Sequence, residues 1–205
     1  MPVRPPVSTG RTENGFTMPA SSIDPFKLIN SFYPPGMTRE ILIAHSMAVA
    51  KLALQIARHT LPGADLEFIR EACLLHDIGI LHTDAPDLGC HGPLPYLAHG
   101  YKGREMLEDL GLPRHALVCE RHTGVGIRSD EVVQQQLPLP VRDYLPESDV
   151  EILICYADLF FSKNPNRRHQ RNSPEQVRQS LTRFGDDKVA TFNRWHARFA
   201  AALQE

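Results

Sequence analysis

Six polar side chains stand at or beside positions where a helical pattern calls for apolar residues. They are four imidazoles and two carboxylates spread over five predicted helices, namely His45, His76, Asp77, His99, His122 and Asp158. A single histidine facing a core is usually a satisfied structural residue. Six such groups on facing helices are typical of a metal site built inside a helical bundle. The sequence therefore predicts that these side chains converge on one point.

The chemistry of this set depends on how its charges are compensated. Two buried carboxylates, Asp77 and Asp158, would repel each other and lose their charge unless a cation compensates them. The four cysteines are too widely spaced along the chain to suggest a thiolate site, whereas ten histidines favour imidazole and carboxylate ligands. We therefore expect one or two divalent metal ions as cofactors, drawn from Fe, Mn, Zn, Ni, Co or Mg.

Helical periodicity runs through most of the chain and positions these residues. A long helix is predicted over residues 38–59, and its inward stripe includes His45. Other helices are predicted from Asp24 and Pro25, from Asp65 to Gly79, from His99 to Leu110, from Pro113 to His122, from a Ser148–Glu151 capping box, from a Ser173–Gln176 start to Gly185, and through Phe199. Residues 80–97 are predicted as a loop and 127–146 as an irregular crossing. No stretch alternates convincingly enough to predict a strand.

Composition predicts one globular domain. The chain has 205 residues, a mass of 23.0 kDa and a formal net charge of −2, so the broad basic surface of a nucleic-acid or membrane binder is not expected. No apolar run resembles the roughly 20 residues of a membrane helix. We interpret residues 1–22 as a disordered tail and residues 23–205 as the domain, with its core in 38–163. The dispersed cysteines favour a cytoplasmic location, and the sequence is compatible with a homodimer.

The segment LLHDIGI around His76 and Asp77 resembles the signature of the HD-domain metal-dependent phosphohydrolases. AHSMAVAKLALQIA, which holds His45, and ICYADLFFSK, which holds Asp158, resemble the flanking landmarks, and LAHGYKGREML and CERHTGVGI supply His99 and His122. The resemblance covers roughly residues 38–163. The chain is similar to small stand-alone proteins of the HDIG type. It implies an all-α fold, an HD-domain helical bundle of about six to eight helices.

The same resemblance implies a dinuclear site. His45, His76, Asp77 and Asp158 would hold one metal, while Asp77 would bridge to a second metal held by His99 and His122. Asp77 is thereby the predicted catalytic residue, because a pair of bridged ions can activate a water molecule for in-line displacement. The implied activity is that of a phosphomonoesterase or phosphodiesterase acting on a nucleotide-like or other small phosphorylated metabolite.

The chain departs from the family pattern where substrate phosphate would bind. Ile80 follows the motif at a position where many HDIG enzymes have lysine, and no GYP triplet is present, so a cyclic-dinucleotide specificity is not supported. A cation must then come from elsewhere. The candidate substrate-binding residues are Lys102, Arg121 and Lys163, together with Asp84 in the loop after the motif.

Two other functions could use the same six residues. Some HD-fold proteins are mixed-valent diiron oxygenases with this constellation, and nitrogen and oxygen ligands suit iron, manganese and zinc alike. A non-catalytic, metal-bearing module that senses a nucleotide is the third hypothesis. Retention of all six ligands argues against a pure binding module, so the phosphohydrolase is the leading prediction.

Overall fold

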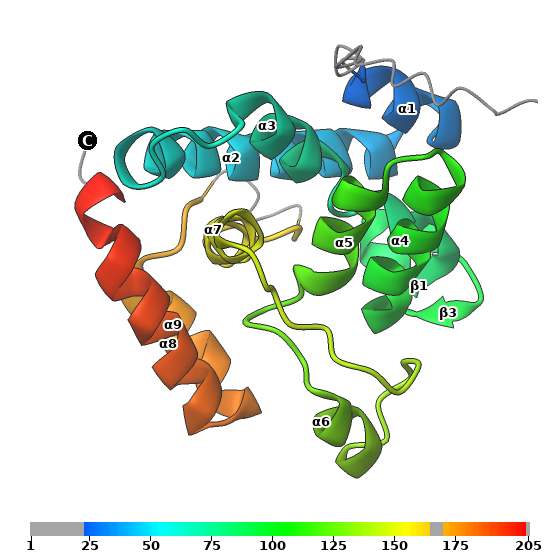
Figure 1. The fold of residues 1–205 in the computed structure, drawn as a ribbon. Helices are drawn as coiled ribbons and strands as arrows, with labels where there is room; N and C mark the ends of the chain where they lie inside the picture. Colours follow the sequence, from blue (N-terminus) through cyan, green and yellow to red (C-terminus); the bar gives the residue numbers. More distant parts are fainter. Residues whose placement is uncertain (1–22, 165–169, 204–205) are drawn as a thin grey trace, which may run out of the picture.

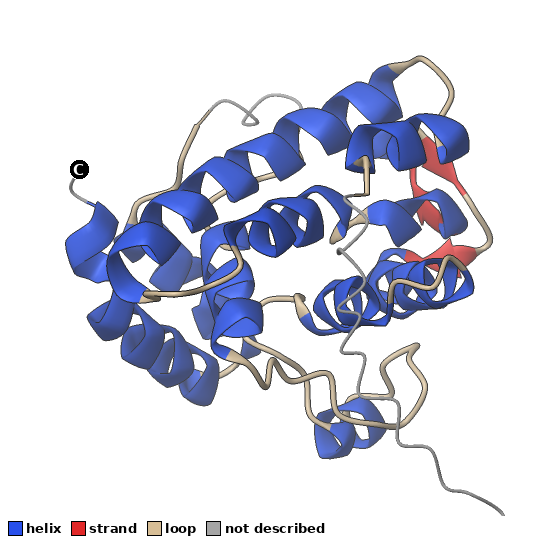
Figure 2. Ribbon diagram, turned by 45° about the horizontal axis from the view of Figure 1, so that its top comes forward, coloured by secondary structure: helices blue, strands red, loops and turns tan. Residues whose placement is uncertain are grey.

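The computed structural model describes residues 23–164 and 170–203, and the expected tail over residues 1–22 lies outside these ranges. Almost all regular structure in the described part is helical (Figure 2). Nine α-helices are present there: α1 (Pro25–Phe32), α2 (Met37–Thr60), α3 (Leu66–Leu75), α4 (His99–Asp109), α5 (Pro113–Arg121), α6 (Ser129–Gln134), α7 (Asp149–Asp158), α8 (Pro174–Leu181) and α9 (Asp186–Phe199). The prediction of an all-α fold is confirmed.

Capping side chains set where several of these helices begin. Asp24, Asp65, Ser148 and Ser173 each accept a hydrogen bond from the backbone N–H three residues later, as their positions in the sequence predict. Ser173 and Gln176 form a reciprocal capping box. The Ser148–Glu151 box is only half formed, because the Glu151 carboxylate accepts hydrogen bonds from Arg121 and from the Glu147 N–H instead.

Two apolar clusters hold the helices together. In Figure 1, α2 and α3 cross the top of the molecule, α4 and α5 lie on one side, and α8 and α9 lie on the other, with α7 seen end-on between them. One cluster joins α2, α3, α7 and the C-terminal helices, and the other joins α1, α3, α4 and α5 to the start of α2. On α2, Leu42 belongs to the second cluster and Val49 to the first. His45 lies between them, so the polar residues meet where the two apolar clusters adjoin.

Residues 80–97 contain short regular elements that periodicity did not predict. The 3₁₀ turns are Ile78–His82, Pro86–Leu88 and Tyr96–Ala98, and the strands are β1 (Thr83–Ala85), β2 (Cys90–His91) and β3 (Leu94–Pro95). The strand order is β2-β1-β3, with β2 antiparallel and β3 parallel to β1. The expectation of no strand is therefore wrong, because strands of two or three residues are too short for alternation to be recognised.

Two further expectations about helices are corrected. The helix expected to end at Gly79 ends at Leu75, and the chain continues as a 3₁₀ turn. The crossing over residues 127–146 contains α6, a helix of 6 residues that adds a ninth helix to the eight expected. Its length gives less than two turns of apolar periodicity, which is too little to distinguish it from irregular chain.

The helix α2 is long and apolar enough to cross a membrane by length and composition alone, although His45, Ser46 and Lys51 interrupt its apolar sequence. However, 56% of its most apolar window is buried inside the protein. Core helices of globular proteins show the same combination of length, composition and burial. This helix also carries His45 into the centre of the molecule.

Gly79 marks a close approach between the turn after α3 and the first turn of α4. A Cβ atom at Gly79 would collide with the His99 carbonyl oxygen and the Gly103 backbone nitrogen. These are backbone atoms, so no side chain can swing away to make room. The contact therefore requires glycine and sets the distance between the Asp77 turn and the helix that begins at His99.

Replacing Gly79 by alanine should destabilise the fold because the new methyl group meets immobile backbone. We expect the free energy of unfolding to fall by about 3 kcal/mol, the upper end for overpacking, in urea denaturation followed by circular dichroism. The control is Leu81→Ala in the same turn, whose exposed side chain should change stability by less than about 1 kcal/mol. Equal stability of Gly79→Ala and the wild type would contradict this packing.

Candidate metal centre

The structure brings all six predicted residues to one point. His45 comes from the middle of α2, His76 and Asp77 directly follow α3, His99 opens α4, His122 directly follows α5, and Asp158 ends α7. Five of the six are at most 3% exposed, and the side chain of Asp158 is 14% exposed. Four of the five contributing helices therefore use an end, where the chain turns and side chains can leave the helix surface.

Three of the four imidazoles are oriented by the same local contact. His76 Nδ1 lies 2.6 Å from the Cys73 carbonyl oxygen, and His122 Nδ1 lies 2.7 Å from that of Cys119. His99 Nδ1 lies 2.7 Å from the Tyr96 carbonyl oxygen. Cys73 and Cys119 lie in the last turns of α3 and α5, where backbone acceptors lack intrahelical donors, whereas Tyr96 begins the 3₁₀ turn that leads into α4. A carbonyl only accepts, so Nδ1 carries a proton and Nε2 is the ring atom that remains to bind a metal.

The first group of ligand atoms surrounds one oxygen of Asp77. His45 Nε2 lies 3.3 Å and His76 Nε2 lies 3.0 Å from Asp77 Oδ2. Asp158 Oδ1 is 2.9 Å from His45 Nε2 and 3.5 Å from His76 Nε2. We call His45, His76 and Asp158, together with this oxygen, the first ligand group.

The second group surrounds the other oxygen of the same carboxylate. His99 Nε2 and His122 Nε2 each lie 3.4 Å from Asp77 Oδ1 and 3.1 Å from each other. We call His99, His122 and this oxygen the second ligand group. Asp77 is thus shared, with one oxygen directed at each group.

These separations fit ligands of a metal ion. A divalent ion lies about 2.0 to 2.2 Å from its nitrogen and oxygen ligands, so two ligands are about 3.0 Å apart at a right angle and about 3.4 Å apart at a tetrahedral angle. The observed separations within the two groups run from 2.9 to 3.5 Å. Both Asp77 oxygens and Asp158 Oδ1 are buried, and within the described residues their neighbours are imidazole nitrogens and, for Asp77 Oδ2, the Lys163 ammonium, none of them in good hydrogen-bond geometry. Buried carboxylate oxygens in this condition suit a cation.

The charges of the group keep both carboxylates ionised. Burial would raise the pKa of Asp77, but the neighbouring His76 and Lys163 lower that pKa well below its ordinary value. Burial also opposes ionisation of Asp158, whose pKa Lys163 and His45 likewise lower. Burial and the adjacent His122 lower the pKa of His99 to about 3, so its imidazole is neutral and available as a ligand.

Of the predicted substrate-binding residues, Lys163 reaches the centre. Its Nζ lies 2.9 Å from Asp77 Oδ2, and its side chain is 15% exposed. Lys102 pairs with Glu105 on the exposed side of α4, and Arg121 pairs with Glu147 and Glu151. Asp84 is exposed in β1, paired in register with His91. Lys102 and Arg121 are therefore engaged by carboxylates outside the six residues.

Tyr96 belongs to the centre and was not predicted. Its ring stacks on His99 at a centroid distance of 4.7 Å, and 37% of the residue is exposed. Its hydroxyl oxygen accepts a hydrogen bond from the Lys163 ammonium. Burial raises the pKa of its phenol to about 12. The signal that could have found it is position, because Tyr96 precedes His99 by three residues, as Cys73 and Cys119 precede His76 and His122.

Comparison with known proteins places the chain in a family. The family profile named HD domain matches residues 42–163, which is more than half of the chain. An uncharacterised protein of Methanocaldococcus jannaschii is 36% identical over 127 residues, which span 60% of this chain and 68% of that protein.

Two further relatives carry the shared segment in longer chains. They are named tRNA (cytidine(56)-2′-O)-methyltransferases, from Thermoplasma volcanium (31% identical over 64% of this chain) and Picrophilus torridus (35% identical over 58%). The matches span 35% and 31% of those proteins, about a third of their length.

Among solved structures, the HD domain of the L. monocytogenes phosphodiesterase PgpH is 16% identical, with a TM-score of 0.48 over 88% of this chain and 99% of that one. The same domain in complex with cyclic-di-AMP is 18% identical, with a TM-score of 0.49 over 86% and 94%. The profile match, which covers more than half of the chain, confirms the resemblance seen in the sequence. The chain belongs to the HD-domain family.

Proposed function

We propose that the protein is a metal-dependent phosphohydrolase that cleaves a phosphate ester with water, releasing an alcohol and a phosphate. The observation that carries this proposal is the sharing of Asp77, whose two oxygens each face a separate group of imidazole nitrogens. A carboxylate in this position can bridge two divalent ions. Two ions so placed suit in-line displacement at phosphorus.

The chain's own residues would hold the ions as follows. His45, His76 and Asp158 with Asp77 Oδ2 would bind one ion, and His99 and His122 with Asp77 Oδ1 would bind the other. When bound, the ions supply Lewis acidity that activates water and stabilises charge on the phosphoryl oxygens. The carbonyls of Cys73, Tyr96 and Cys119 keep three imidazoles in the tautomer that binds metal.

Lys163 is the residue best placed to bind the substrate phosphate. Its ammonium lies beside Asp77 and is oriented by the hydroxyl of Tyr96. Two carboxylates give −2 and two divalent ions give +4, so the loaded centre favours an anionic substrate. An ammonium at its edge would add a charge-assisted hydrogen bond to a phosphate oxygen.

Nucleotide-derived phosphate esters are the first substrates to examine. The two methyltransferases that share this segment act, by their names, on tRNA, and that association supports a nucleotide-like substrate. Small phosphorylated metabolites without a base belong in the same panel as a comparison.

The activity itself is the first test. Anaerobically purified protein, supplied in turn with Mn, Mg, Co, Ni, Zn or Fe, should release phosphate or alcohol from members of a phosphomonoester and phosphodiester panel, and chelation should abolish turnover. Asp77→Asn, which removes one bridging charge, should abolish it as well. No hydrolysis with any metal, combined with oxygen consumption on an organic substrate when iron is loaded, would establish the diiron oxygenase instead. Binding of nucleotides without either reaction would establish a sensor.

Metal content should separate the two ligand groups. Elemental analysis should find two ions per chain in the wild type and fewer than two in His99→Ala, because the first ligand group remains intact. Asp77→Asn should lose both ions, since each group shares its carboxylate, and should lose the rise in melting temperature that metal produces. The control is His91→Ala, an exposed strand residue expected to keep both ions. Full metal content in Asp77→Asn would refute the shared ligand.

Lys163→Ala should weaken substrate binding while the metals stay. We expect KM for the phosphate ester to rise by roughly tenfold, given about 1.5 to 3 kcal/mol for a hydrogen bond to a charged group, with metal content unchanged. Lys102→Ala is the matched control, because Lys102 pairs with Glu105 on the surface and should leave KM unaltered. A larger effect of Lys102→Ala than of Lys163→Ala would reverse this assignment.

A further inference from the structure

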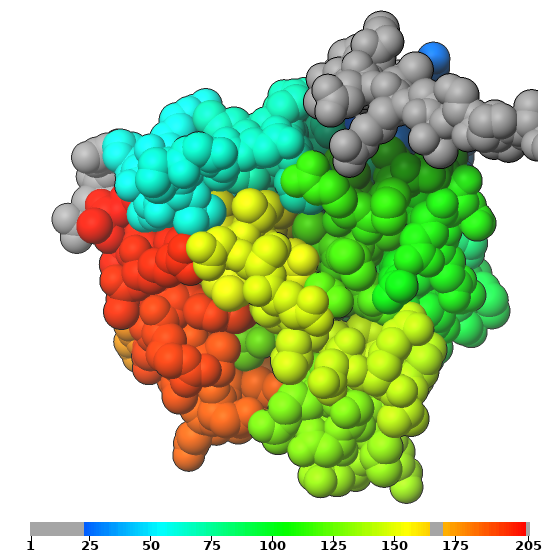
Figure 3. Space-filling model, viewed as in Figure 1, coloured from blue at the N-terminus to red at the C-terminus, as the bar shows by residue number. Residues whose placement is uncertain are grey.

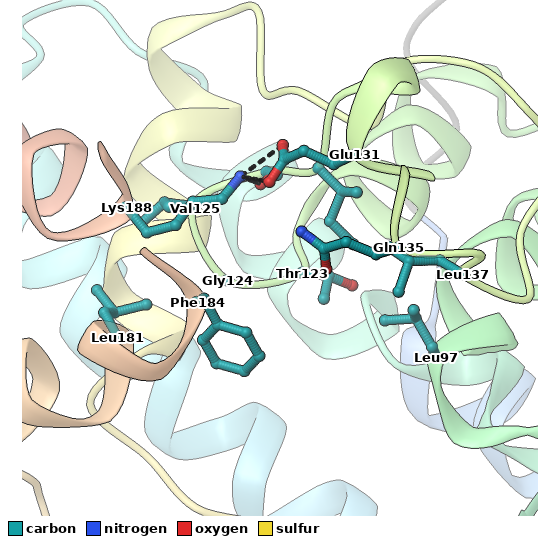
Figure 4. A pocket seen from close by; sticks show the side chains of 12 residues that line it. Leu97, Thr123, Gly124, Val125, Glu131, Gln135, Leu137, Leu181, Phe184 and Lys188 are labelled. Atoms are coloured by element: carbon teal, nitrogen blue, oxygen red, sulfur yellow. Dashed lines mark hydrogen bonds and ion pairs between the residues drawn. The ribbon is translucent and has the colours of Figure 1, made fainter. Parts of the chain in front are cut away.

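A pocket of about 160 Å³ lies outside the candidate metal centre, between the segment after α5 and the C-terminal helices. The surface in Figure 3 is hollowed where the orange C-terminal helices meet the green and yellow-green segments around α6. The close-up in Figure 4 shows Leu181 and Phe184 on one side, Leu97 and Leu137 on the other, and Thr123 and Gln135 between them.

Two segments connect this pocket to the second ligand group. Thr123 directly follows His122, and residues 123–127 form one wall. Leu97 precedes His99 by two residues and contributes to the opposite side. Both imidazoles of the second ligand group are thus joined through the backbone to residues that line the pocket. A ligand that fills the pocket is expected to extend toward that side of the centre.

The pocket combines apolar walls with two free polar side chains. Its walls are largely aliphatic, and Phe184, 55% exposed, stands at its edge. The hydroxyl of Thr123 and the amide of Gln135 make no side-chain hydrogen bond to any residue in the described ranges. Pockets of this kind, mostly apolar with a few polar groups, are typical of sites for small organic ligands.

The one charged pair in the wall is already satisfied. Lys188 Nζ lies 2.6 and 2.7 Å from the two oxygens of Glu131 and donates to the Gly126 carbonyl oxygen at 2.9 Å. Glu131 also accepts a hydrogen bond from the Arg128 N–H. These contacts neutralise both charges and tie α9 to α6, so the pocket suits a neutral group rather than a phosphate.

We propose that this pocket binds the base of a nucleoside phosphate, an inference that rests on the proposed phosphohydrolase function and specifies its substrate class. A base has two apolar faces, which match the aliphatic walls, and a polar edge, which matches the Gln135 amide and the Thr123 hydroxyl. The volume is close to the roughly 150 Å³ of an apolar cavity that accepts benzene. An aliphatic group would make no use of the half-buried Thr123 hydroxyl or of the exposed Gln135 amide, and a sugar alone would not match the apolar walls.

Substrate comparison tests the pocket. Rates on the four common nucleoside 5′-monophosphates are measured against ribose 5-phosphate, which has the phosphate and sugar without the base. Gln135→Ala should raise KM for the preferred monophosphate by about three- to tenfold, the effect of one lost hydrogen bond, and leave ribose 5-phosphate unchanged. Leu137→Trp, which fills the pocket, should raise that KM further. Gln134→Ala, a neighbour in α6 that does not line the pocket, is the matched control.

A second measurement needs no turnover. The four free nucleosides are titrated into metal-free wild type and into Leu137→Trp, and binding is followed by calorimetry. If nucleosides bind to the wild type but not to Leu137→Trp, the assignment of the pocket as a base-binding site is supported. This holds even if no phosphate ester is hydrolysed and the proposed function fails. If ribose 5-phosphate and the nucleoside monophosphates are hydrolysed with equal KM, and neither variant changes that KM, the assignment of the pocket as a base-binding site is overturned. The proposed function then remains intact. If the protein neither binds nucleosides nor hydrolyses any phosphate ester, both the pocket assignment and the proposed function are overturned.

Discussion

Two carboxylates buried in the middle of this protein impose the constraint on which the rest of the structure depends. Asp77 is fully buried and the side chain of Asp158 nearly so, and ionised carboxylates in an interior require nearby positive charge or donors. In this fold, four imidazoles and one ammonium lie beside these carboxylates. Because these groups come from widely separated parts of the chain, five helices must meet at this point.

The way in which the helices meet follows from what their ends provide. The last turn of a helix exposes carbonyl oxygens without donors, and His76 and His122 satisfy two of them with Nδ1. The same contact turns Nε2 toward Asp77. Close packing of Gly79 against the backbone of α4 then brings the second ligand group within reach of the same carboxylate. Local backbone chemistry and tight packing together produce the shared geometry of Asp77.

The convergence of the six polar residues could be predicted from the sequence, but their surroundings could not. Each of the six polar residues occupies or adjoins an apolar stripe of a helix long enough to show its period, so its inward direction was visible. Lys163, Lys102 and Arg121 could not be ranked, because all three lie near a ligand in sequence and only tertiary contacts show which is paired elsewhere. Tyr96 escaped notice because it lies in a short 3₁₀ turn within a segment that has no periodicity. The helix α6 and the three strands were likewise not predicted, because they are too short to show a period.

The central claim is that Asp77 bridges two metal ions, and diffraction from crystals of metal-loaded protein tests it most directly. Anomalous difference maps, recorded on both sides of the absorption edge of the bound metal, locate each ion without reference to activity. We expect two peaks, one among His45, His76, Asp158 and Asp77 Oδ2, and the other among His99, His122 and Asp77 Oδ1. A single peak that excludes Asp77, or peaks confined to other residues, would contradict it.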